Sequence, residues 1–419
     1  MGAKAVQAGG GHMNWIESEE TEIEKTVEEW LRANLPANWI AAIDTDDAVG
    51  LRESRELLDV ADWWERLGDA RWYVSTWPEQ YGGLGFDSRR AAAVNNVLRR
   101  YKVPRSDNPL GNNVSQALLR WGTEEQRQRY LPGIAHQREI WVQLFSEPGA
   151  GSDLAGLSTR AVRDGDIWVV HGQKVWSSWA HEANFGILLA RTDTEIPKHQ
   201  GLSIFIVDMS SSGVVVRPLR QITGESFFNE VFLDDVTVPD AMRIGELGGG
   251  WRIASSLLNY ERGAVIGGGS AAPSMGVGRT IDALIRHYAP VEDPLERQRI
   301  AIAYTRDRIT AWTRQRHEAE RRAGRSVGNE SSILKLFHSQ SNQALQTLSI
   351  DLEGINGIAY QEGDDWAATT AYGFLRVRSA TIAGGTSEIQ RNIIGENVLG
   401  LPREPSTDRD LPWSQVPRS

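Results

Sequence analysis

The chain has 419 residues, about three times the length of a typical domain, so it can form two or three packed units with a large core. Its 45 Lys and Arg against 55 Asp and Glu give a net charge of −10, which argues against a nucleic-acid or anionic-membrane surface. The absence of Cys excludes disulfides and thiolate catalysis, so any redox chemistry must come from a bound cofactor. No apolar run approaches the roughly 20 residues of a membrane helix, and we expect a cytoplasmic protein.

The N-terminal part of the chain has a helical pattern. The first residues, Met1–His12, resemble a segment added for expression, and we expect the natural chain to begin at Met13. Apolar residues then recur at three- and four-residue spacing, which predicts a helical domain over 13–138. Its predicted helices are Glu19–Leu35, Leu51–Leu67, Ser88–Arg100, Val114–Arg120 and Glu124–Leu131. The Pro and Gly residues of Trp77–Gly85 predict a turn between two of them.

A different pattern occupies 139–244, where short apolar runs alternate with turn residues and predict a β-barrel or sandwich domain. The seven runs are Ile140–Phe145, Ser158–Arg163, Ile167–Val170, Phe185–Ala190, Ser203–Val207, Val214–Pro218 and Glu230–Phe232. Helical periodicity returns over 245–403 and predicts an antiparallel bundle. Its helices are expected over Ile253–Val265, Thr280–Tyr288, Glu296–Arg321 and Ser331–Leu352. Residues 404–419 are expected to form a surface-running or loose tail.

Three segments could carry chemistry, although each also has an ordinary structural explanation. The glycines of Ser146–Asp153 would let backbone N–H groups approach an anionic or carbonyl-rich ligand, but they would also suit any turn between strands. Lys174–Trp179 offers an indole beside hydroxyl groups, although a Trp at a strand end more often packs in a core. Ala383–Gln390 precedes an apolar helix start, where Thr-Ser-Glu is also a common N-terminal cap.

Taken together, in this order and spacing, these segments resemble the acyl-CoA dehydrogenase family of flavoproteins over about residues 13–403. The matching motifs are Glu147-Pro148-Gly149-Ala150-Gly151-Ser152-Asp153, Gly172-Gln173-Lys174-Val175-Trp176 and Gly385-Thr386-Ser387-Glu388-Ile389-Gln390-Arg391-Asn392. The resemblance implies an α+β multidomain fold with helical, β and helical domains in that order. It also implies non-covalent FAD, a role in fatty-acid or lipid metabolism and, commonly, a tetramer built as a dimer of dimers.

The resemblance also assigns a cofactor site. The implied cofactor-binding residues are Phe145, Ser146, Gly151, Ser152, Trp176, Ser178, Thr386 and Glu388. Ser146, beside the Phe145 backbone, would meet the pyrimidine edge of the flavin, and Trp176 would flank the ring system. Ser178 would lie near N5, the flavin atom that accepts hydride. Ser152 would also contact the thioester arm of the substrate, and the last two residues would approach the cofactor from the C-terminal bundle.

The catalytic base is where the chain departs from most relatives. Many carry Tyr-Glu-Gly-Thr, whose Glu removes the α-proton, whereas the aligned stretch here is Ala383-Gly384-Gly385-Thr386. A minority branch places its Glu on a helix before an Arg, and this chain has Leu258-Asn259-Tyr260-Glu261-Arg262. Glu261 is therefore the predicted base and Arg262 a substrate contact, the alternative for Glu261 being an ordinary helix-surface residue. Burial would raise the pKa of such a carboxylate and strengthen it as a base. Gly384 keeps the backbone N–H that would help to hold the thioester carbonyl.

Two FAD motifs also depart from the family pattern. The Arg-x-x-Phe-Gly segment is not recognisable, since Arg286 is followed by His287-Tyr288-Ala289-Pro290, and Gln-x-x-Gly-Gly-x-Gly becomes Asp351–Gly357 with Asp for Gln and Ile for one Gly. Either the ADP half of FAD is held differently, or a second, related chain supplies part of the site. His171 replaces the usual Asn of Asn-Gly-Gln-Lys, and we assign it no catalytic role. No metal site is predicted, because the His-Glu pairs lack a second His four residues after the first.

We therefore predict an FAD-dependent dehydrogenase that converts an acyl thioester, of CoA or of an acyl carrier protein, to the trans-2-enoyl thioester. Electrons would pass to an electron-transfer flavoprotein. One alternative is a flavin-dependent oxidase or monooxygenase on the same fold, and another is a non-catalytic subunit of a heterotetramer. The missing side chain at Gly384 and the helix-borne base would suit a branched or polycyclic acyl group.

Overall fold

A computed structural model describes residues 20–104, 110–266, 278–322, 328–361 and 363–417, without the side chains of residues 48, 110, 261–266 and 321–322. Contacts divide the chain into two compact units. One consists of Met1–Arg105 with Leu131–Arg138, and the other of Ser106–Tyr130 with Glu139–Ser419. The domain boundaries at 138, 244 and 403 remain our proposal, because this division groups the sheet with the C-terminal helices.

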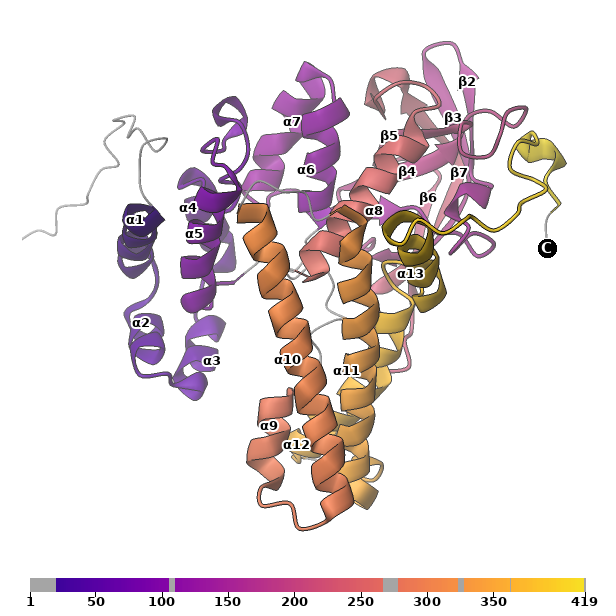
Figure 1. Cartoon of the computed structure of the whole chain (residues 1–419). Coiled ribbons are helices and arrows are strands. Elements are labelled where there is room, and N and C mark those ends of the chain that lie inside the picture. The colour runs from indigo at the N-terminus through magenta and orange to yellow at the C-terminus, as the bar shows by residue number, and fades with distance from the viewer. Residues whose placement is uncertain (1–19, 105–109, 267–277, 323–327, 362, 418–419) are drawn as a thin grey trace, which may run out of the picture. The chain divides into compact units, whose positions relative to one another are not determined.

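The first unit is built from short amphipathic helices (Figure 1). They are α1 (Glu20–Asn34), α2 (Ala37–Asp44), α3 (Ala48–Glu56), α4 (Val60–Asp69) and α5 (Ser88–Arg100). Ile23, Val27 and Leu31 recur every four residues on α1, so they share one face and are fully buried. They pack in one core with Trp39 of α2 and Trp63 of α4.

One helix predicted in this unit is wrong. The Leu51–Leu67 pattern corresponds to two helices, α3 and α4, separated by Leu57–Asp59. Asp59 causes the break, because its side chain accepts a hydrogen bond from the Asp62 amide and starts a new helix. The short helix α2 was not predicted. Ser88–Arg100 is confirmed as α5, where Asp87 caps the helix in the same way.

The second unit begins with α6 (Leu110–Trp121) and continues through a mixed sheet. Helix α7 (Glu124–Ala135) has residues up to Tyr130 in this unit and its residues from Leu131 on in the first. It continues past Pro132, where the sequence pattern predicts its end. The strands are β1 (Trp141–Leu144), β2 (Arg160–Asp164), β3 (Ile167–Ser178), β4 (Phe185–Arg191), β5 (Leu202–Asp208), β6 (Val214–Leu219), β7 (Phe228–Pro239) and β8 (Arg243–Ile244). They form one sheet in the order β6-β7-β3-β2-β4-β5-β8, with β1 paired in parallel to β4.

The central strands β3 and β7 are much longer than the runs Ile167–Val170 and Glu230–Phe232 that predict them. They pair antiparallel along most of their length, with irregularities between Val170 and Gly172 and between Lys174 and Ser177. Each irregularity interrupts the alternation of apolar and polar residues, which is why periodicity alone shortens both strands. The long β3 carries the segment from His171 to Ser178 into the sheet.

The C-terminal helices form the predicted bundle. They are α8 (Gly250–Ile266), α9 (Ile281–Tyr288), α10 (Pro294–Arg322), α11 (Ser331–Glu353), α12 (Asp365–Arg376) and α13 (Ser387–Ile393). Of these, α12 was not predicted, whereas α13 begins where a helix start was expected. The long helices α10 and α11 lie side by side (Figure 1), and α8 also packs against α11. A helical domain, a sheet and a helical bundle thus follow one another along the chain, and the predicted fold class is confirmed.

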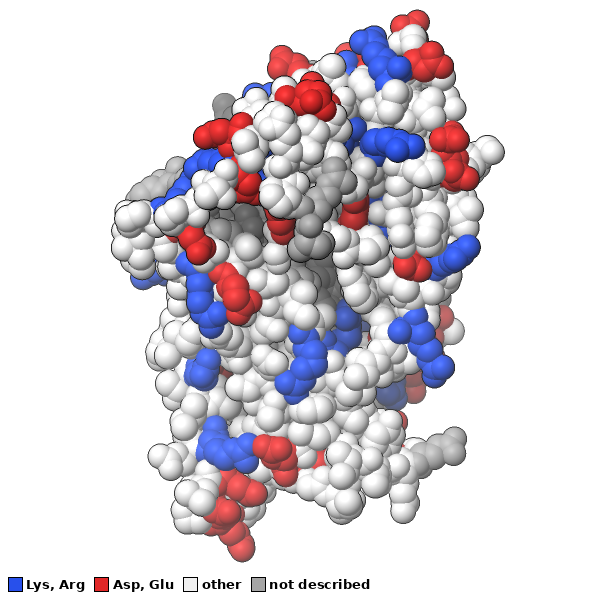
Figure 2. Space-filling view, turned by 90° about the vertical axis from the view of Figure 1, so that its right-hand side faces the viewer, with Lys and Arg blue, Asp and Glu red and all other residues white. Residues whose placement is uncertain are grey.

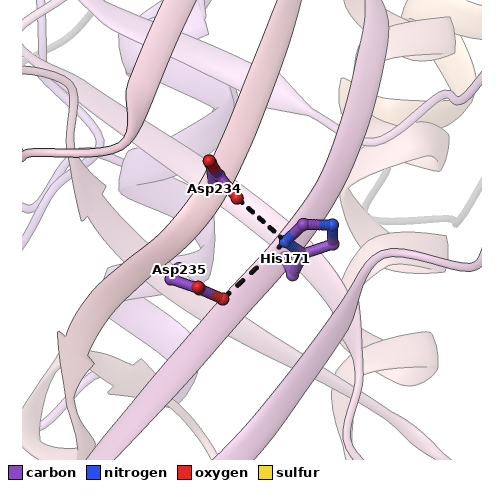
Figure 3. A group of neighbouring side chains, drawn as sticks. All are labelled: His171, Asp234 and Asp235. Atoms are coloured by element: carbon purple, nitrogen blue, oxygen red, sulfur yellow. Dashed lines mark ion pairs between the residues drawn. The ribbon is translucent and has the colours of Figure 1, made fainter.

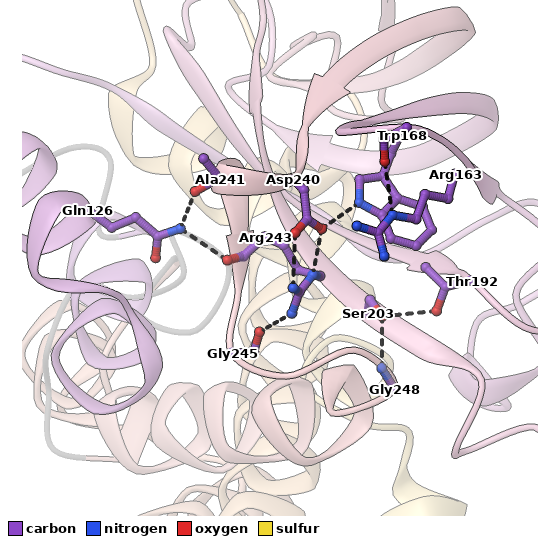
Figure 4. A network of polar contacts seen from close by, with 11 residues as sticks. Gln126, Arg163, Trp168, Thr192, Ser203, Asp240, Ala241, Arg243, Gly245 and Gly248 are labelled. Atoms are coloured by element: carbon purple, nitrogen blue, oxygen red, sulfur yellow. Dashed lines mark hydrogen bonds and ion pairs between the residues drawn. The ribbon is translucent and has the colours of Figure 1, made fainter.

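The start of α8 is fixed closely against the sheet. A Cβ on Gly250 would lie 2.7 Å from backbone atoms of Leu202 and Ser203, so only Gly allows this approach. The Ser203 hydroxyl accepts a hydrogen bond from the Gly248 amide at 3.0 Å (Figure 4). These contacts fix the start of α8 against β5. Helix α8 carries the predicted base.

The same edge of the sheet is held by a polar network around Asp240 (Figure 4). Its carboxylate accepts hydrogen bonds from the Arg243 Nε at 3.0 Å and the Trp168 Nε1 at 2.8 Å, and these bonds lower the pKa of Asp240 to about 2. Gln126 donates to the carbonyls of Ala241 and Arg243 at 2.8 and 3.0 Å. The network joins the start of α7 to the segment between β7 and β8.

The segment predicted as a surface-running or loose tail is anchored to the sheet. The Trp413 side chain is only 8% exposed, and its amide donates to the Ile196 carbonyl at 3.0 Å. The Arg191 guanidinium lies over the Trp413 ring, 4.3 Å from its centroid. Arg191 is itself buried and donates to the carbonyls of Ala155 and Leu157 at 2.6 and 3.1 Å. The described part of the tail is therefore not loose.

The surface carries charges of both signs. Figure 2 shows Lys and Arg interspersed with Asp and Glu over the face that it presents. Among the described residues, no helix combines the length and the apolar composition needed to cross a bilayer.

Candidate active site

The loop Ser146–Asp153 follows β1 and is fixed by a buried ion pair between Glu147 and Lys174. Lys174 on β3 is completely buried, and its Nζ lies 2.8 Å from the Glu147 carboxylate. The same Nζ donates to the carbonyls of Phe145 and Leu189 at 3.0 and 2.8 Å. Because an ammonium group loses its hydration on burial, all three acceptors are needed to stabilise it. Lys174 thus fixes the backbone at Phe145, where the cofactor segment begins.

Glu147 is held equally firmly. Its carboxylate accepts the backbone amides of Ser158 and Thr159 at 2.7 and 2.9 Å. Burial alone would raise the pKa of Glu147, but the Lys174 charge and these hydrogen bonds outweigh burial and lower it. Burial lowers the pKa of Lys174 to about 8. The pair closes the Ser146–Asp153 loop onto the start of β2.

Trp176 has an exposed indole and an unusual backbone conformation. Its side chain is 62% exposed, and its backbone adopts φ +59°, a conformation that bulky residues rarely take. The Phe228 ring packs edge-on against it, with 5.8 Å between centroids. The Val175 amide donates to the Ser146 carbonyl at 2.9 Å, so the predicted cofactor segments of the loop and of β3 lie side by side.

The predicted cofactor segments also carry hydroxyl groups. Within the described residues, the side chains of Ser146, Ser152 and Ser178 have no hydrogen-bond partner. An exposed aromatic plane and hydroxyl groups on the same and the adjoining segment suit a ring system that presents carbonyl and nitrogen acceptors at its edge, as an isoalloxazine does. Gly151 lies in an exposed stretch where a Cβ would meet no described atom within 4 Å. The residues present therefore fit the flavin half of FAD.

The sequence pattern did not predict a group of aromatic residues near Trp176, which consists of Trp179, Phe227 and Phe228 together with Arg376. Phe227 stacks on Trp179 with 5.8 Å between centroids, and the Arg376 guanidinium of α12 lies 4.6 Å from the Phe227 centroid. The same guanidinium lies 5.5 Å from the Phe228 centroid. Arg376 is buried, and desolvation lowers its pKa. The group ties α12 to the segment before β7, and the adjacent Phe227-Phe228 was the only sequence signal for it.

A second turn lies at the predicted position of the thioester, between α12 and α13. Gly384 and Gly385 have φ of +66° and +93°, which favours Gly at both positions. The Lys335 Nζ of α11 donates to the Gly385 carbonyl at 2.6 Å. Gln390 is fully buried, and its Nε2 donates to the Gly384 and Gly385 carbonyls at 2.9 and 3.2 Å. Two donors thus converge on a two-glycine turn, and neither was predicted.

The residues after this turn form the helix cap that the sequence pattern allows. The Thr386 side chain accepts from the Ile389 amide at 3.3 Å and starts α13. Glu388 is exposed and pairs with Arg391 at 3.2 Å, while its own amide and the Thr386 hydroxyl lower its pKa. Cofactor contacts by Thr386 and Glu388 remain predictions.

Glu261 and Arg262 lie on α8, and their side chains are outside the described part of the structure. The helix is well placed for the predicted role, because its buried residues Ile253, Ala254 and Leu257 face the fold and α8 packs against α11. Helix α11 also carries Lys335, which reaches the Gly384–Gly385 turn. The base assignment remains a prediction.

The altered FAD motifs are engaged in contacts within the chain. Asp351, which replaces Gln, pairs with Arg299 of α10. Glu353 accepts hydrogen bonds from Tyr288 and Trp366, and the Arg279 guanidinium lies 3.7 Å from the Trp366 centroid. The altered motif residues thus hold the helices of the bundle together. How the ADP half of FAD is bound remains a separate prediction.

His171 forms a surface cluster with two carboxylates of β7. Its Nδ1 lies 3.3 Å from Asp234 and 3.8 Å from Asp235 (Figure 3). The ligand atoms of the three residues lie within 4.8 Å of one another, close enough to share a cation. All three side chains are exposed, and contacts of this kind in water contribute little to stability.

Models of the three acyl-CoA dehydrogenase domains match most of the chain. The N-terminal domain matches residues 17–138, the middle domain 143–236 and the C-terminal domain 248–399. Acyl-CoA dehydrogenase IpdE1 of Mycobacterium tuberculosis is 37% identical over 91% of this chain and 98% of its own length. Acyl-CoA dehydrogenase FadE34 of the same organism is 38% identical over 80% of this chain and 46% of its own length.

A solved structure agrees with these relatives. The steroid acyl-CoA dehydrogenase Tcur3481-Tcur3483 superposes with a TM-score of 0.72 at 27% identity, over 92% of this chain and 98% of the matched chain. The α–β–α order, the exposed Trp176 beside the Ser146 backbone and the similarity along nearly the whole chain agree on one identity. The chain belongs to the acyl-CoA dehydrogenase family, and it is an FAD-dependent oxidoreductase that acts on acyl-CoA.

Proposed function

We propose that this enzyme dehydrogenates an acyl-CoA with a bulky, ring-bearing acyl group, and that Glu261 removes the α-proton. The observation that carries the proposal is the environment of Gly384, which stands where many relatives carry their catalytic Glu. A Cβ there would meet only one described atom within 4 Å, the Lys335 Cε at 3.9 Å. The turn therefore leaves room that a carboxylate side chain fills in those relatives, and a wide acyl group could use it.

Names of relatives support the same class of substrate. One relative is a cyclohexane-1-carbonyl-CoA dehydrogenase of Geobacter metallireducens, 30% identical over 67% of this chain and 74% of its own length. The steroid enzyme named above is another. Both names refer to ring-bearing acyl groups, and we extend that class to this chain.

The chain's own residues would divide the work as follows. Trp176, Ser146 and Ser178 would hold the flavin, and FAD supplies the acceptor for the β-hydride when it is bound. The Gly384 backbone N–H would hold the thioester carbonyl and stabilise the charge that develops on its oxygen. The Glu261 carboxylate would take the α-proton. Arg262 and Ser152 would contact the CoA arm.

An association with a second chain is also part of the proposal. Apolar residues lie exposed along one side of α10, at positions that recur with heptad spacing. They are Leu295, Ile302, Ile309 and Trp312. A row of this kind on a long helix favours burial against another helix. The name of the steroid enzyme joins two designations, Tcur3481 and Tcur3483. We propose a homo- or heterotetramer here, with an electron-transfer flavoprotein as acceptor and a cytoplasmic location.

The test is anaerobic bleaching of the purified yellow protein by a panel of acyl-CoA thioesters. Ring-bearing and branched substrates should reduce the flavin faster than straight-chain ones, and faster bleaching by straight chains would contradict the bulky substrate. Glu261→Gln should slow the reduction about 100-fold or more, the usual contribution of a general base. Glu292→Gln, at an exposed residue before α10, is the matched control and should react normally.

Two further readouts separate the alternatives. Fast reoxidation of the reduced enzyme by air, without an electron-transfer flavoprotein, would identify an oxidase instead. A colourless protein that becomes yellow only on co-expression with a related chain would show that the FAD site is completed by that partner.

A further inference from the structure

The side chain of Gln390 braces the turn that precedes its own helix. Gln390 belongs to α13 and is completely buried. Its Nε2 donates to the Gly384 carbonyl at 2.9 Å and to the Gly385 carbonyl at 3.2 Å. Among the described residues, no other group donates to the Gly384 carbonyl. A Cβ on Gly385 would lie 2.6 Å from the Gln390 Nε2, so the amide reaches the turn only because Gly385 has no side chain.

This contact leaves one polar atom without a partner. The Gln390 Oε1 is buried, and within the described residues it accepts no hydrogen bond. Leaving a buried acceptor unsatisfied costs about 1–3 kcal/mol. The amide cannot be turned to relieve this cost, because both carbonyls require the NH₂ end of the side chain. An unsatisfied buried group of this kind indicates a use beyond packing.

The two carbonyl groups fix the direction of two N–H groups. Both peptide bonds of the turn are trans, so each N–H points opposite to the C=O of the same peptide plane. The Gly384 carbonyl is directed toward the buried Gln390 amide, and the Gly385 N–H therefore points away from it. The Gly385 carbonyl directs the Thr386 N–H in the same way. Within the described residues, neither of these N–H groups has a hydrogen-bond acceptor.

We propose that Gln390 is a positioning residue, which aims the Gly385 N–H at the thioester oxygen of the substrate as a second donor beside the Gly384 N–H. This inference rests on the proposed function, which places the thioester carbonyl at this turn. Successive N–H groups in a turn of this kind, with both glycines at positive φ, form a concave site for a partly negative oxygen. Gln390 keeps the turn in that form without touching the substrate.

The two donors act on one step. The α C–H bond breaks, the proton goes to the Glu261 carboxylate, and the electron pair moves toward the thioester oxygen. The pair then forms the double bond as the β-hydrogen leaves as hydride to FAD. The Gly384 and Gly385 N–H groups stabilise the negative charge on the oxygen between these events, and neither transfers a proton. Donors that are oriented before the charge develops need no rearrangement during the reaction.

The enolate of a 3-oxoacyl thioester measures this stabilisation without redox turnover. Acetoacetyl-CoA is bound to the FAD-loaded enzyme, and its ultraviolet enolate absorbance is followed as a function of pH. Gln390→Met keeps the length of the side chain but loses the amide. The apparent pKa of the bound ligand should therefore rise by about one unit, which corresponds to a tenfold weaker stabilisation of the enolate.

A second variant tests the same contact from the side of the turn. Gly385→Ala places a methyl group against the Gln390 amide and should also raise the enolate pKa. Because both changes break one contact, the shift in the double variant should be smaller than the sum of the two single shifts. An unchanged enolate pKa in folded, yellow Gln390→Met and Gly385→Ala would overturn the inference.

Gln346→Met is the matched control. Gln346 is another buried glutamine of the bundle, and its amide braces the Arg279 backbone with hydrogen bonds of 2.9 and 3.0 Å. Its replacement should lower the unfolding free energy as Gln390→Met does, but leave the enolate pKa unchanged. An equal pKa shift in Gln346→Met would also overturn the inference, since the effect would then come from general loosening of the bundle.

Failure of this inference is distinct from failure of the proposed function. If no acyl-CoA bleached the flavin but the enolate pKa still depended on Gln390, the dehydrogenation proposal would fail and the positioning role would stand. If ring-bearing substrates bleached the flavin and the enolate pKa were the same in Gln390→Met, the positioning role alone would fail. Weaker FAD binding by Gln390→Met with an unchanged enolate pKa would assign the N–H groups to the cofactor and overturn the inference as well.

Discussion

The two proposed halves of the active site are each held by a buried lysine, but the two lysines are used differently. Lys174 in the sheet meets the Glu147 carboxylate at 2.8 Å and two backbone carbonyls, so its charge is matched by an opposite charge at hydrogen-bond distance. The hydrogen bond described for Lys335 in the bundle goes to the neutral Gly385 carbonyl. Lys174 therefore fixes the Ser146–Asp153 loop through an ion pair, whereas Lys335 holds the backbone of the Gly384–Gly385 turn.

The largest effect on folding is expected from breaking the matched pair. Lys174→Met would leave the Glu147 carboxylate buried without its cation, and removal of one partner from such a pair costs about 3–5 kcal/mol of unfolding free energy. Denaturant unfolding of the variant measures this loss. Lys102→Met, at a more exposed lysine paired with Asp46 at 3.3 Å, is the control and should change the free energy by about 0.5 kcal/mol or less. A loss below about 1 kcal/mol for Lys174→Met would break the comparison.

A smaller and pH-dependent effect is expected from the other partner. Glu147→Gln keeps an oxygen that can accept the Ser158 or Thr159 amide, so its cost at neutral pH should be about 1–3 kcal/mol. The folded-state pKa of Glu147 is lowered below the reference value of 4.5, so its stabilisation is present above pH 4.5 and lost as the pH falls through the folded pKa. Unfolding curves of wild type and variant should therefore converge on acidification below pH 4.5. A constant difference down to pH 3 would exclude Glu147 as the source.

The smallest effect on stability is expected from Lys335→Met. The Gly385 carbonyl keeps its bond to Gln390, so Lys335→Met removes one of the two donors described for that carbonyl. We expect a loss of about 1 kcal/mol in denaturant unfolding, the usual net contribution of one hydrogen bond. Severe unfolding of this variant would mean that Lys335 serves the fold as Lys174 does, and the distinction between the two lysines would disappear.

Prediction from the sequence succeeded where a single element carries its own signal. The bounds of α5 follow from apolar spacing and an Asp cap, and the fold class follows from the change in periodicity near residues 139 and 245. It failed where two elements decide the outcome together. The strand β3 looks short because its irregularities, at Gly172 and before Ser177, are accommodated only by pairing with β7.

The candidate site divides in the same way. Ser146, Trp176 and Ser178 belong to motifs of contiguous residues, and the structure brings the two segments that carry them together. Lys335 and Arg376 belong to helices with ordinary amphipathic patterns, where nothing in the local sequence distinguishes a buried cation from a solvated one. Their burial depends on the Gly384–Gly385 turn and on the segment before β7, which are distant in sequence.

The anchoring of Trp413 on Arg191 has a consequence for the order of folding. Arg191 holds the backbone after the Ser146–Asp153 loop. Its guanidinium is covered by the indole of Trp413, which lies 222 positions later in the chain. During synthesis the strands are made long before Trp413. Until Trp413 packs on it, the Arg191 guanidinium remains exposed to water. Contacts of such long range close late and slow folding. We therefore expect the segment Ala155–Leu157, which Arg191 contacts, to be among the last parts of the sheet to reach its final environment.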